Sequence, residues 1–97
     1  MDHYVVLGRW TEQGAKTVRE TTKRADAVKA LASKHGGKFE LWWTMGEYDF
    51  VGLLDAPSDE VANQIILSAG IQGNVRTRTM KAWTASEMEK LVSKIPP

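Results

Sequence analysis

Two strand-like segments joined by a very short connection constrain the fold more than any other feature of this sequence. Both are rich in aromatic and β-branched residues: residues 38–45 (KFELWWTM) and residues 48–55 (YDFVGLLD). The connection is Gly46-Glu47, and glycine at the first of two loop positions is typical of a type II′ β-hairpin. We therefore predict a hairpin in which Thr44 faces Asp49 and Trp43 faces Phe50.

The hairpin register also assigns every side chain of the two strands to a face, because residues paired across antiparallel strands lie on the same side. One face is apolar enough to lie under helices and carries Phe39, Leu41, Trp43, Met45, Tyr48, Phe50, Gly52 and Leu54. The opposite face carries Lys38, Glu40, Trp42, Thr44, Asp49, Val51, Leu53 and Asp55. On this assignment Trp43 is a core residue and Trp42 contacts a partner chain.

The remaining segments alternate between strand and helix patterns. Residues 4–10 (YVVLGRW) and 74–83 (NVRTRTMKAW) read as strands. Residues 15–35 have helical spacing with a break near Glu20, so that the main helix begins at Thr21 or Thr22. A second helix is predicted from Pro57-Ser58 to Gly70 or Gly73, and a capping box, Thr84 to Glu87, opens a last amphipathic helix over 84–95.

The order strand, helix, strand, strand, helix, strand predicts an α+β fold. It is the ferredoxin-like βαββαβ sandwich, with a four-stranded antiparallel sheet in the order 4-1-3-2. A chain of 97 residues has the length of one domain, so we assign residues 1–97 to a single domain with residues 84–95 as an accessory C-terminal helix.

The two central strands lack the alternation of a sheet with one wet face. The runs VVLG (residues 5–8) and FVGLL (residues 50–54) are apolar at successive positions, which indicates that both faces of the sheet are covered. Helices cover one face, and the same sheet of a second subunit is the simplest cover for the other. We therefore predict a homodimer or a higher homo-oligomer.

Composition limits the partners of the chain. Thirteen basic and twelve acidic side chains give a net charge of +1, too small to attract nucleic acid or an anionic membrane over long range. The absence of cysteine excludes disulfides and thiolate metal sites. Apolar runs such as residues 50–54 are too short to span a bilayer, and the N-terminus lacks a signal-peptide pattern, so we expect a cytoplasmic protein.

Three stretches of this sequence resemble the GYD domain family: "WTEQG", "TMGEYDFVGLLDAP" and "GNVRTRTMKAWT". The resemblance runs from about Tyr4 to Trp83. It implies a small protein of the dimeric α/β-barrel group, named for a Gly/Tyr/Asp signature that matches Gly46, Tyr48 and Asp49 here. It implies no particular activity, since fold relatives range from cofactor-free monooxygenases and isomerases to haem enzymes.

Topology locates a candidate site where the signature lies. The end of the first strand, the hairpin tip and the start of the last strand meet at one edge of the predicted sheet, and such a mixture of apolar walls and polar groups suits a small-ligand pocket. Candidate catalytic residues are Asp49 and Tyr48, which could act as general acid or base without a cofactor or metal. Candidate ligand-binding residues are Arg9, Trp10, Thr44, Asn74 and Arg76.

Structural roles compete with these functional ones. Asp49 could pair with Arg9 or Arg76, or accept a hydrogen bond from Thr44, and the chain would then be an oligomerising module without chemistry. An RNA-recognition module has the same element order, but Glu47 and Asp49 place negative charge where such a module meets phosphate. We therefore predict a small-molecule-binding protein or cofactor-free enzyme, and no nucleic-acid partner.

Overall fold

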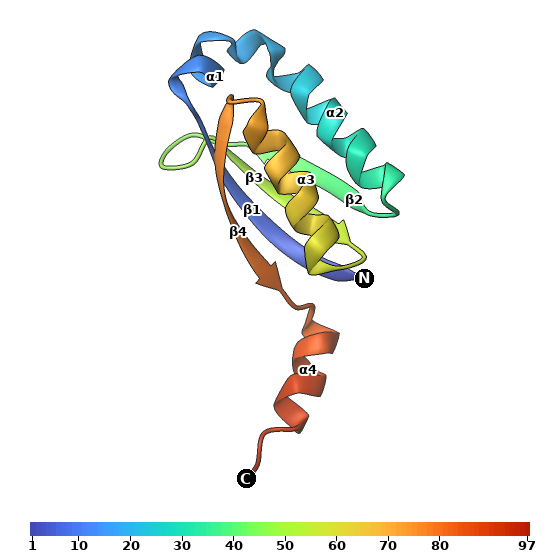
Figure 1. Cartoon of the computed structure of the whole chain (residues 1–97). Coiled ribbons are helices and arrows are strands. Elements are labelled where there is room, and N and C mark those ends of the chain that lie inside the picture. Colours follow the sequence, from blue (N-terminus) through green and yellow to red (C-terminus); the bar gives the residue numbers. More distant parts are fainter.

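A computed structural model describes residues 1–97 as a four-stranded sheet with helices on one face (Figure 1). The elements in chain order are β1 (Asp2–Trp10), α1 (Glu12–Lys16), the 3-10 helix η1 (Val18–Glu20), α2 (Thr21–Lys34), β2 (Lys38–Trp43), β3 (Phe50–Ala56), α3 (Asp59–Ile71), β4 (Val75–Ala82) and α4 (Ala85–Ser93). None of the four α-helices combines the length and the apolar character needed to cross a bilayer.

All strand pairs are antiparallel, and the strand order is β2-β3-β1-β4, which is the predicted order read from the other edge. The predicted ferredoxin-like fold is therefore confirmed. β2 and β3 pair in the predicted register, with Trp43 opposite Phe50 and Leu41 opposite Gly52. The predicted break before the main helix is also confirmed, because α2 begins at Thr21 directly after η1.

Side chains at the helix termini set several of these boundaries. The Ser58 hydroxyl accepts a hydrogen bond from the backbone N–H of Val61 and so caps α3. Thr84 and Glu87 form the predicted capping box of α4. Gly73 follows α3 with a φ of +81°, a backbone conformation that glycine adopts without steric cost.

The core lies between the sheet and helices α2 and α3. α2 packs on β2 and α3 on β3 and β4. Two phenylalanine rings of the core cover glycines of a neighbouring strand: Phe50 lies over Gly8, and Phe39 lies over Gly52. The buried core residues are Tyr4, Val6, Ala32, Phe39, Phe50, Leu54, Ala56, Ala62 and Ile65.

The tip of the hairpin differs from the prediction. β2 ends at Trp43 and β3 begins at Phe50, so residues 44–49 form a longer loop in place of a two-residue turn. The N–H of Thr44 still donates to the carbonyl of Asp49 (2.8 Å), but the N–H of Asp49 turns to the carbonyl of Gly8 on β1 (2.8 Å). Pairing with β1 thus draws Asp49 away from a tight turn. The predicted pair of Met45 with Tyr48 is absent from the β2–β3 ladder.

Two side chains of this region are less buried than predicted. Met45, assigned to the face under the helices, is 99% exposed because the loop carries it beyond the sheet. Trp43 does lie on the helix side, where its indole N–H donates to the Thr21 hydroxyl (3.1 Å), but it remains 40% exposed. Trp43, at the end of β2, therefore lies at the boundary of the core beside the start of α2. The prediction that it is a core residue was wrong.

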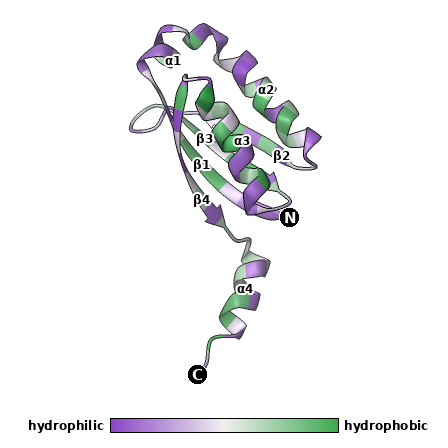
Figure 2. Ribbon diagram, viewed as in Figure 1, coloured by the Kyte–Doolittle hydropathy of each residue, from purple (hydrophilic) through white to green (hydrophobic).

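No element of the chain covers the second face of the sheet. Its apolar side chains form a surface that we call the open face: Val5, Leu7, Trp42, Val51, Leu53 and Met80. α4 extends away from the sheet (Figure 1), and hydrophobic residues lie both along the strands and on α4 (Figure 2). The radius of gyration is 14.9 Å, whereas a compact chain of this length has roughly 12.5 Å.

The contact between Phe50 and Gly8 generates a stability prediction. A Cβ added at Gly8 would lie 1.9 Å from the Phe50 ring, so the ring must move out of the packed core. We expect Gly8→Ala to lower the free energy of unfolding by about 1–3 kcal/mol, measured by urea denaturation. Gly70→Ala is the control, because a Cβ there enters open space on α3 and should stabilise by up to about 1 kcal/mol. Equal effects of the two substitutions would contradict this packing.

Candidate functional site

Asp49 of the signature is bound to the end of β1. Its N–H donates to the carbonyl of Gly8 (2.8 Å), and its carboxylate accepts from the backbone N–H of Trp10 (2.9 Å). The carboxylate thus takes the place of a strand carbonyl where β3 leaves the β1 ladder. Thr44 does donate to Asp49, but from its backbone N–H to the Asp49 carbonyl (2.8 Å). The side chains of Arg9, Arg76 and Thr44 all bond elsewhere, so none of them pairs with the carboxylate.

Arg9 holds the hairpin loop against the end of β1. Its Nε donates to the carbonyl of Glu47 (2.9 Å), and its Nη2 lies 3.0 Å from the Glu47 carboxylate. Its guanidinium carbon also lies 4.8 Å from the centre of the Tyr48 ring, within the range of a cation–π contact. The Thr44 hydroxyl donates to the carbonyl of Tyr48 (2.6 Å). We call this set the signature cluster: Arg9, Trp10, Thr44, Glu47, Tyr48 and Asp49.

The other two predicted ligand-binding residues lie outside this cluster. Arg76 donates to the carbonyls of Gly70 (3.2 Å) and Val75 (2.8 Å) at the edge of the sheet. Asn74 precedes β4, and its side-chain oxygen accepts from the Gln13 amide (2.9 Å). Arg76 lies opposite Arg9 in the β1–β4 ladder, and the carbonyl of Asn74 accepts from the N–H of Thr11 (3.0 Å). All seven predicted residues therefore lie at one end of the sheet, but the side chains of Arg76 and Asn74 bond outside the cluster.

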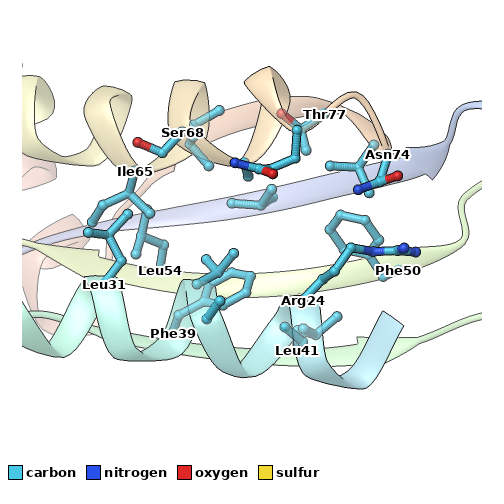
Figure 3. A pocket seen from close by; sticks show the side chains of 18 of the residues that line it. Arg24, Leu31, Phe39, Leu41, Phe50, Leu54, Ile65, Ser68, Asn74 and Thr77 are labelled. Carbon is cyan, nitrogen blue, oxygen red and sulfur yellow. The ribbon is translucent and has the colours of Figure 1, made fainter. Parts of the chain in front are cut away.

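A cavity of about 370 Å³ opens on the helix side of the sheet, between α2 and α3 (Figure 3). Its polar lining residues are Thr21, Arg24, Ser68, Gln72, Asn74 and Thr77. Its apolar lining residues are Val6, Ala25, Ala27, Val28, Leu31, Phe39, Leu41, Trp43, Phe50, Leu54, Ile65, Ile66, Ala69 and Val75. We call it the central cavity. Asn74 is the one predicted site residue in its lining, which includes neither Tyr48 nor Asp49.

The polar and apolar groups of the central cavity are unevenly distributed. Arg24 and Asn74 lie at the end where the Phe50 ring forms the floor (Figure 3). Leu31, Leu54 and Ile65 line the other end (Figure 3). The Ser68 hydroxyl donates to the carbonyl of Gln64 (2.8 Å) within α3, so its hydrogen is already used. Arg24 is the single ionisable side chain of the lining.

Shifted pKa values occur at the end of the sheet remote from the signature cluster. The hydrogen bond between His3 and Asp55 (2.6 Å) raises the pKa of His3, and Glu87 of α4 lies 3.7 Å from the other ring nitrogen. No group of three or more His, Asp or Glu side chains is arranged to hold a metal ion. His3 therefore ties β1 to β3 and to the first turn of α4.

A second cavity, of about 280 Å³, lies at the start of α3 and is lined in part by Tyr4, Asp59 and Lys81. The Tyr4 hydroxyl donates to the Asp59 carboxylate, which also lies 3.0 Å from the Lys81 ammonium. Burial raises the pKa of Tyr4, and the hydrogen bond from Tyr4 lowers the pKa of Asp59. These contacts join α3 to β1 and β4, which is a structural role.

Comparison with known proteins identifies the family. The GYD domain model matches residues 4–92. This chain belongs to the GYD domain family. No curated protein matches the sequence.

Solved structures confirm the fold of this GYD domain. The crystal structure of TTHA0845 from Thermus thermophilus is similar with a TM-score of 0.54 and 22% identity, covering 88% of this chain and 96% of that one. The de novo designed protein Ferredog-Diesel is similar with a TM-score of 0.53 and 13% identity, covering 84% of this chain and 85% of the design. At these identities the likeness concerns the fold alone.

The sequence reasoning missed most of the central cavity. Arg24, Thr21, Ser68 and Gln72 lie on or next to helices that were read only as cover for the sheet. A signal was available for Arg24, because residues 24, 25, 28 and 31 have the spacing of one helix face, and a cation on an otherwise apolar face is uncommon. Catalysis by Asp49 and Tyr48 stays a prediction.

The bonds of Asp49 predict a structural effect of its removal. Asp49→Ala leaves the half-buried N–H of Trp10 without its acceptor and should lower the free energy of unfolding by about 1–3 kcal/mol. Asp49→Asn should cost less, because an amide oxygen can accept the same bond. The control is Asp26→Ala on the exposed side of α2, expected within about 0.5 kcal/mol of the parent. An unchanged urea midpoint for Asp49→Ala would refute this role.

Proposed function

We propose that this GYD domain binds a small, largely apolar molecule in the central cavity. The observation that carries the proposal is the composition of the lining, in which fourteen of twenty residues are hydrophobic. The volume of about 370 Å³ falls within the usual range of small-molecule sites, which begins near 300 Å³. A few polar groups among apolar walls are what such sites use to orient a ligand.

Binding is a better match to this cavity than acid–base catalysis. A general acid or base must lie within hydrogen-bond reach of the proton that it transfers. The lining contains no carboxylate, imidazole or phenol, and its one ionisable group is a guanidinium, which offers hydrogen-bond donors and no acceptor. The candidate acid–base residues Asp49 and Tyr48 belong to the signature cluster, outside the lining. We therefore propose binding rather than catalysis for the central cavity.

Filling the central cavity tests this function. Ala69 lines the cavity on α3, and Ala69→Phe should occupy the space that a ligand needs. Octanol and octanoate serve as probes, with binding measured by isothermal titration calorimetry and by the rise in melting temperature. Ala30→Phe is the control, since Ala30 is exposed on α2 outside the lining. We expect binding to the parent and to Ala30→Phe, and its loss in Ala69→Phe. If neither octanol nor octanoate binds to the parent chain, the proposal is contradicted.

We also propose a homodimer in which the open face of each chain covers that of the other. The six apolar residues of the open face form one contiguous surface, in which Trp42, Leu53 and Met80 are exposed and Val5, Leu7 and Val51 are half-buried. Contiguous apolar surfaces of this kind mark interaction sites, whereas single exposed apolar residues do not. A second copy of this chain is the occupant that we favour because a two-fold contact places the same apolar surface on both partners.

α4 supports the dimer independently of the sheet. Met88, Leu91 and Val92 are exposed, and their spacing places them on one side of α4. Ile95, just after the helix, is exposed as well. A helix this short is marginal without tertiary packing, and an apolar stripe in water adds no such packing. The radius of gyration also exceeds that of a compact chain of this length. We propose that α4 reaches across and packs on the partner subunit.

A charge placed on the open face tests the dimer. We expect the parent chain to sediment as a dimer at micromolar concentration, and Leu53→Arg to shift it toward monomer because a guanidinium would be buried in the contact. Leu67→Arg is the matched control: Leu67 is 57% exposed on α3, compared with 46% for Leu53, and lies away from the open face. A monomeric parent chain would refute the proposed dimer without bearing on the cavity.

A further inference from the structure

We infer that the ligand of the central cavity carries a single anionic head group, a carboxylate, and that Arg24 binds it. This inference rests on the proposed function and specifies its ligand class. It follows from the position of Arg24, from the absence of a carboxylate partner, and from the polar groups at the same end of the cavity.

The Arg24 guanidinium, which lines the central cavity, is held in place by the segment that precedes α2. Its Nη1 donates to the carbonyl and to the hydroxyl of Thr17, at 3.1 and 3.0 Å, and its Nη2 lies 3.5 Å from the carbonyl of Gly14. These acceptors are neutral, so they orient the group without neutralising its charge. A guanidinium has five N–H donors, and these three bonds use both hydrogens of Nη1 and one of Nη2. One N–H of Nη2 and the N–H of Nε remain to bind a ligand.

No protein carboxylate balances this charge. Arg24 takes part in none of the ion pairs of the chain. Glu20, one helical turn before Arg24, lies 3.7 Å from Lys23 instead. A cation beside an apolar cavity is stabilised when an anion enters with it, because opposite charges attract more strongly where water is excluded.

Uncharged donors lie at the same end of the cavity. The Asn74 side-chain oxygen accepts from Gln13, which fixes the amide and leaves its NH₂ group to donate to a ligand. Asn74, Phe50 and Arg24 lie toward one end of the cavity in Figure 3, whereas Leu31 and Ile65 lie toward the other end. A ligand with its carboxylate at Arg24 would therefore extend an apolar body toward Leu31 and Ile65.

One positive charge favours a singly charged head group. A carboxylate matches the planar fork of the guanidinium and can accept two parallel hydrogen bonds. A doubly charged phosphate would leave one charge uncompensated beside apolar walls, which is costly. A cationic head group would meet the Arg24 charge directly.

A head-group series tests the inference, with octanoate, octanol and octylamine titrated into the full chain by calorimetry. We expect octanoate to bind about 10- to 100-fold more tightly than octanol, the range of a hydrogen bond to a charged group, and octylamine to bind most weakly. Arg24→Gln should abolish the preference for octanoate while octanol binding persists. Arg24→Lys should restore part of the preference, since it keeps the charge but loses the fork.

The matched control is Arg19→Gln, an exposed arginine of η1 outside the cavity lining, which should leave the preference unchanged. Equal affinities for octanoate and octanol, or an unchanged preference in a folded Arg24→Gln, would overturn the anionic head group and leave the binding function intact. Failure of all three probes to bind would overturn both. If Arg24→Gln does not fold, Arg24→Lys replaces it in the test. A folded Arg24→Lys whose preference for octanoate equals that of the parent would then overturn the role of the guanidinium fork, and a reduced preference would support it.

Discussion

The sheet is apolar on both faces, but the helices of the chain cover only one of them. The rest of this structure depends on that constraint. α2 and α3 cover the face of Val6 and Leu54, and the open face with Leu53 has no cover within the chain. Burial of apolar side chains is the main favourable term in folding and association, at about 25 cal/mol per Å². The open face is therefore the basis of the proposed homodimer, to which we also assign α4, which extends beyond the sheet (Figure 1).

The covered face is not filled completely. α2 lies over β2 and α3 lies over β3 and β4, so the two helices leave a space above the middle of the sheet. The rings of Phe50 and Phe39 fit because Gly8 and Gly52 have no side chains to displace them. Flat rings on glycines form a low floor, and the central cavity opens above it. The same glycines that allow the core to pack thus also leave room for the central cavity.

The sequence predicted the topology well because the hydrophobic period and the turn residues determine it locally. The β2–β3 register, the start of α2 at Thr21 and the capping box at Thr84 all follow from neighbouring residues. The prediction of a two-residue turn at the hairpin tip was wrong, because the shape of the tip depends on β1, whose Gly8 carbonyl accepts a hydrogen bond from Asp49. That contact joins residues far apart in the chain, and local turn preferences contain no information about it.

The candidate site likewise has a part that local sequence predicts and a part that depends on tertiary structure. Convergence of the signature residues at one sheet edge could be predicted, because strand direction alone brings Arg9, Trp10 and Asp49 together. The cavity could not, because its presence depends on how far α2 and α3 lie apart, and helix spacing is set by side-chain packing over the whole face. The helix spacing could have marked Arg24 as a cation on an apolar face, but only the tertiary structure shows that this face borders a cavity.

The signature and the cavity are nevertheless physically connected through Phe50. Asp49 is anchored to β1 twice, at the carbonyl of Gly8 and at the N–H of Trp10. Phe50 is the next residue, and its ring covers Gly8 and forms the cavity floor beside Arg24. The two bonds of Asp49 therefore fix the backbone from which that ring projects. In this arrangement Asp49 positions one wall of the proposed binding site although its own carboxylate lies outside the cavity lining.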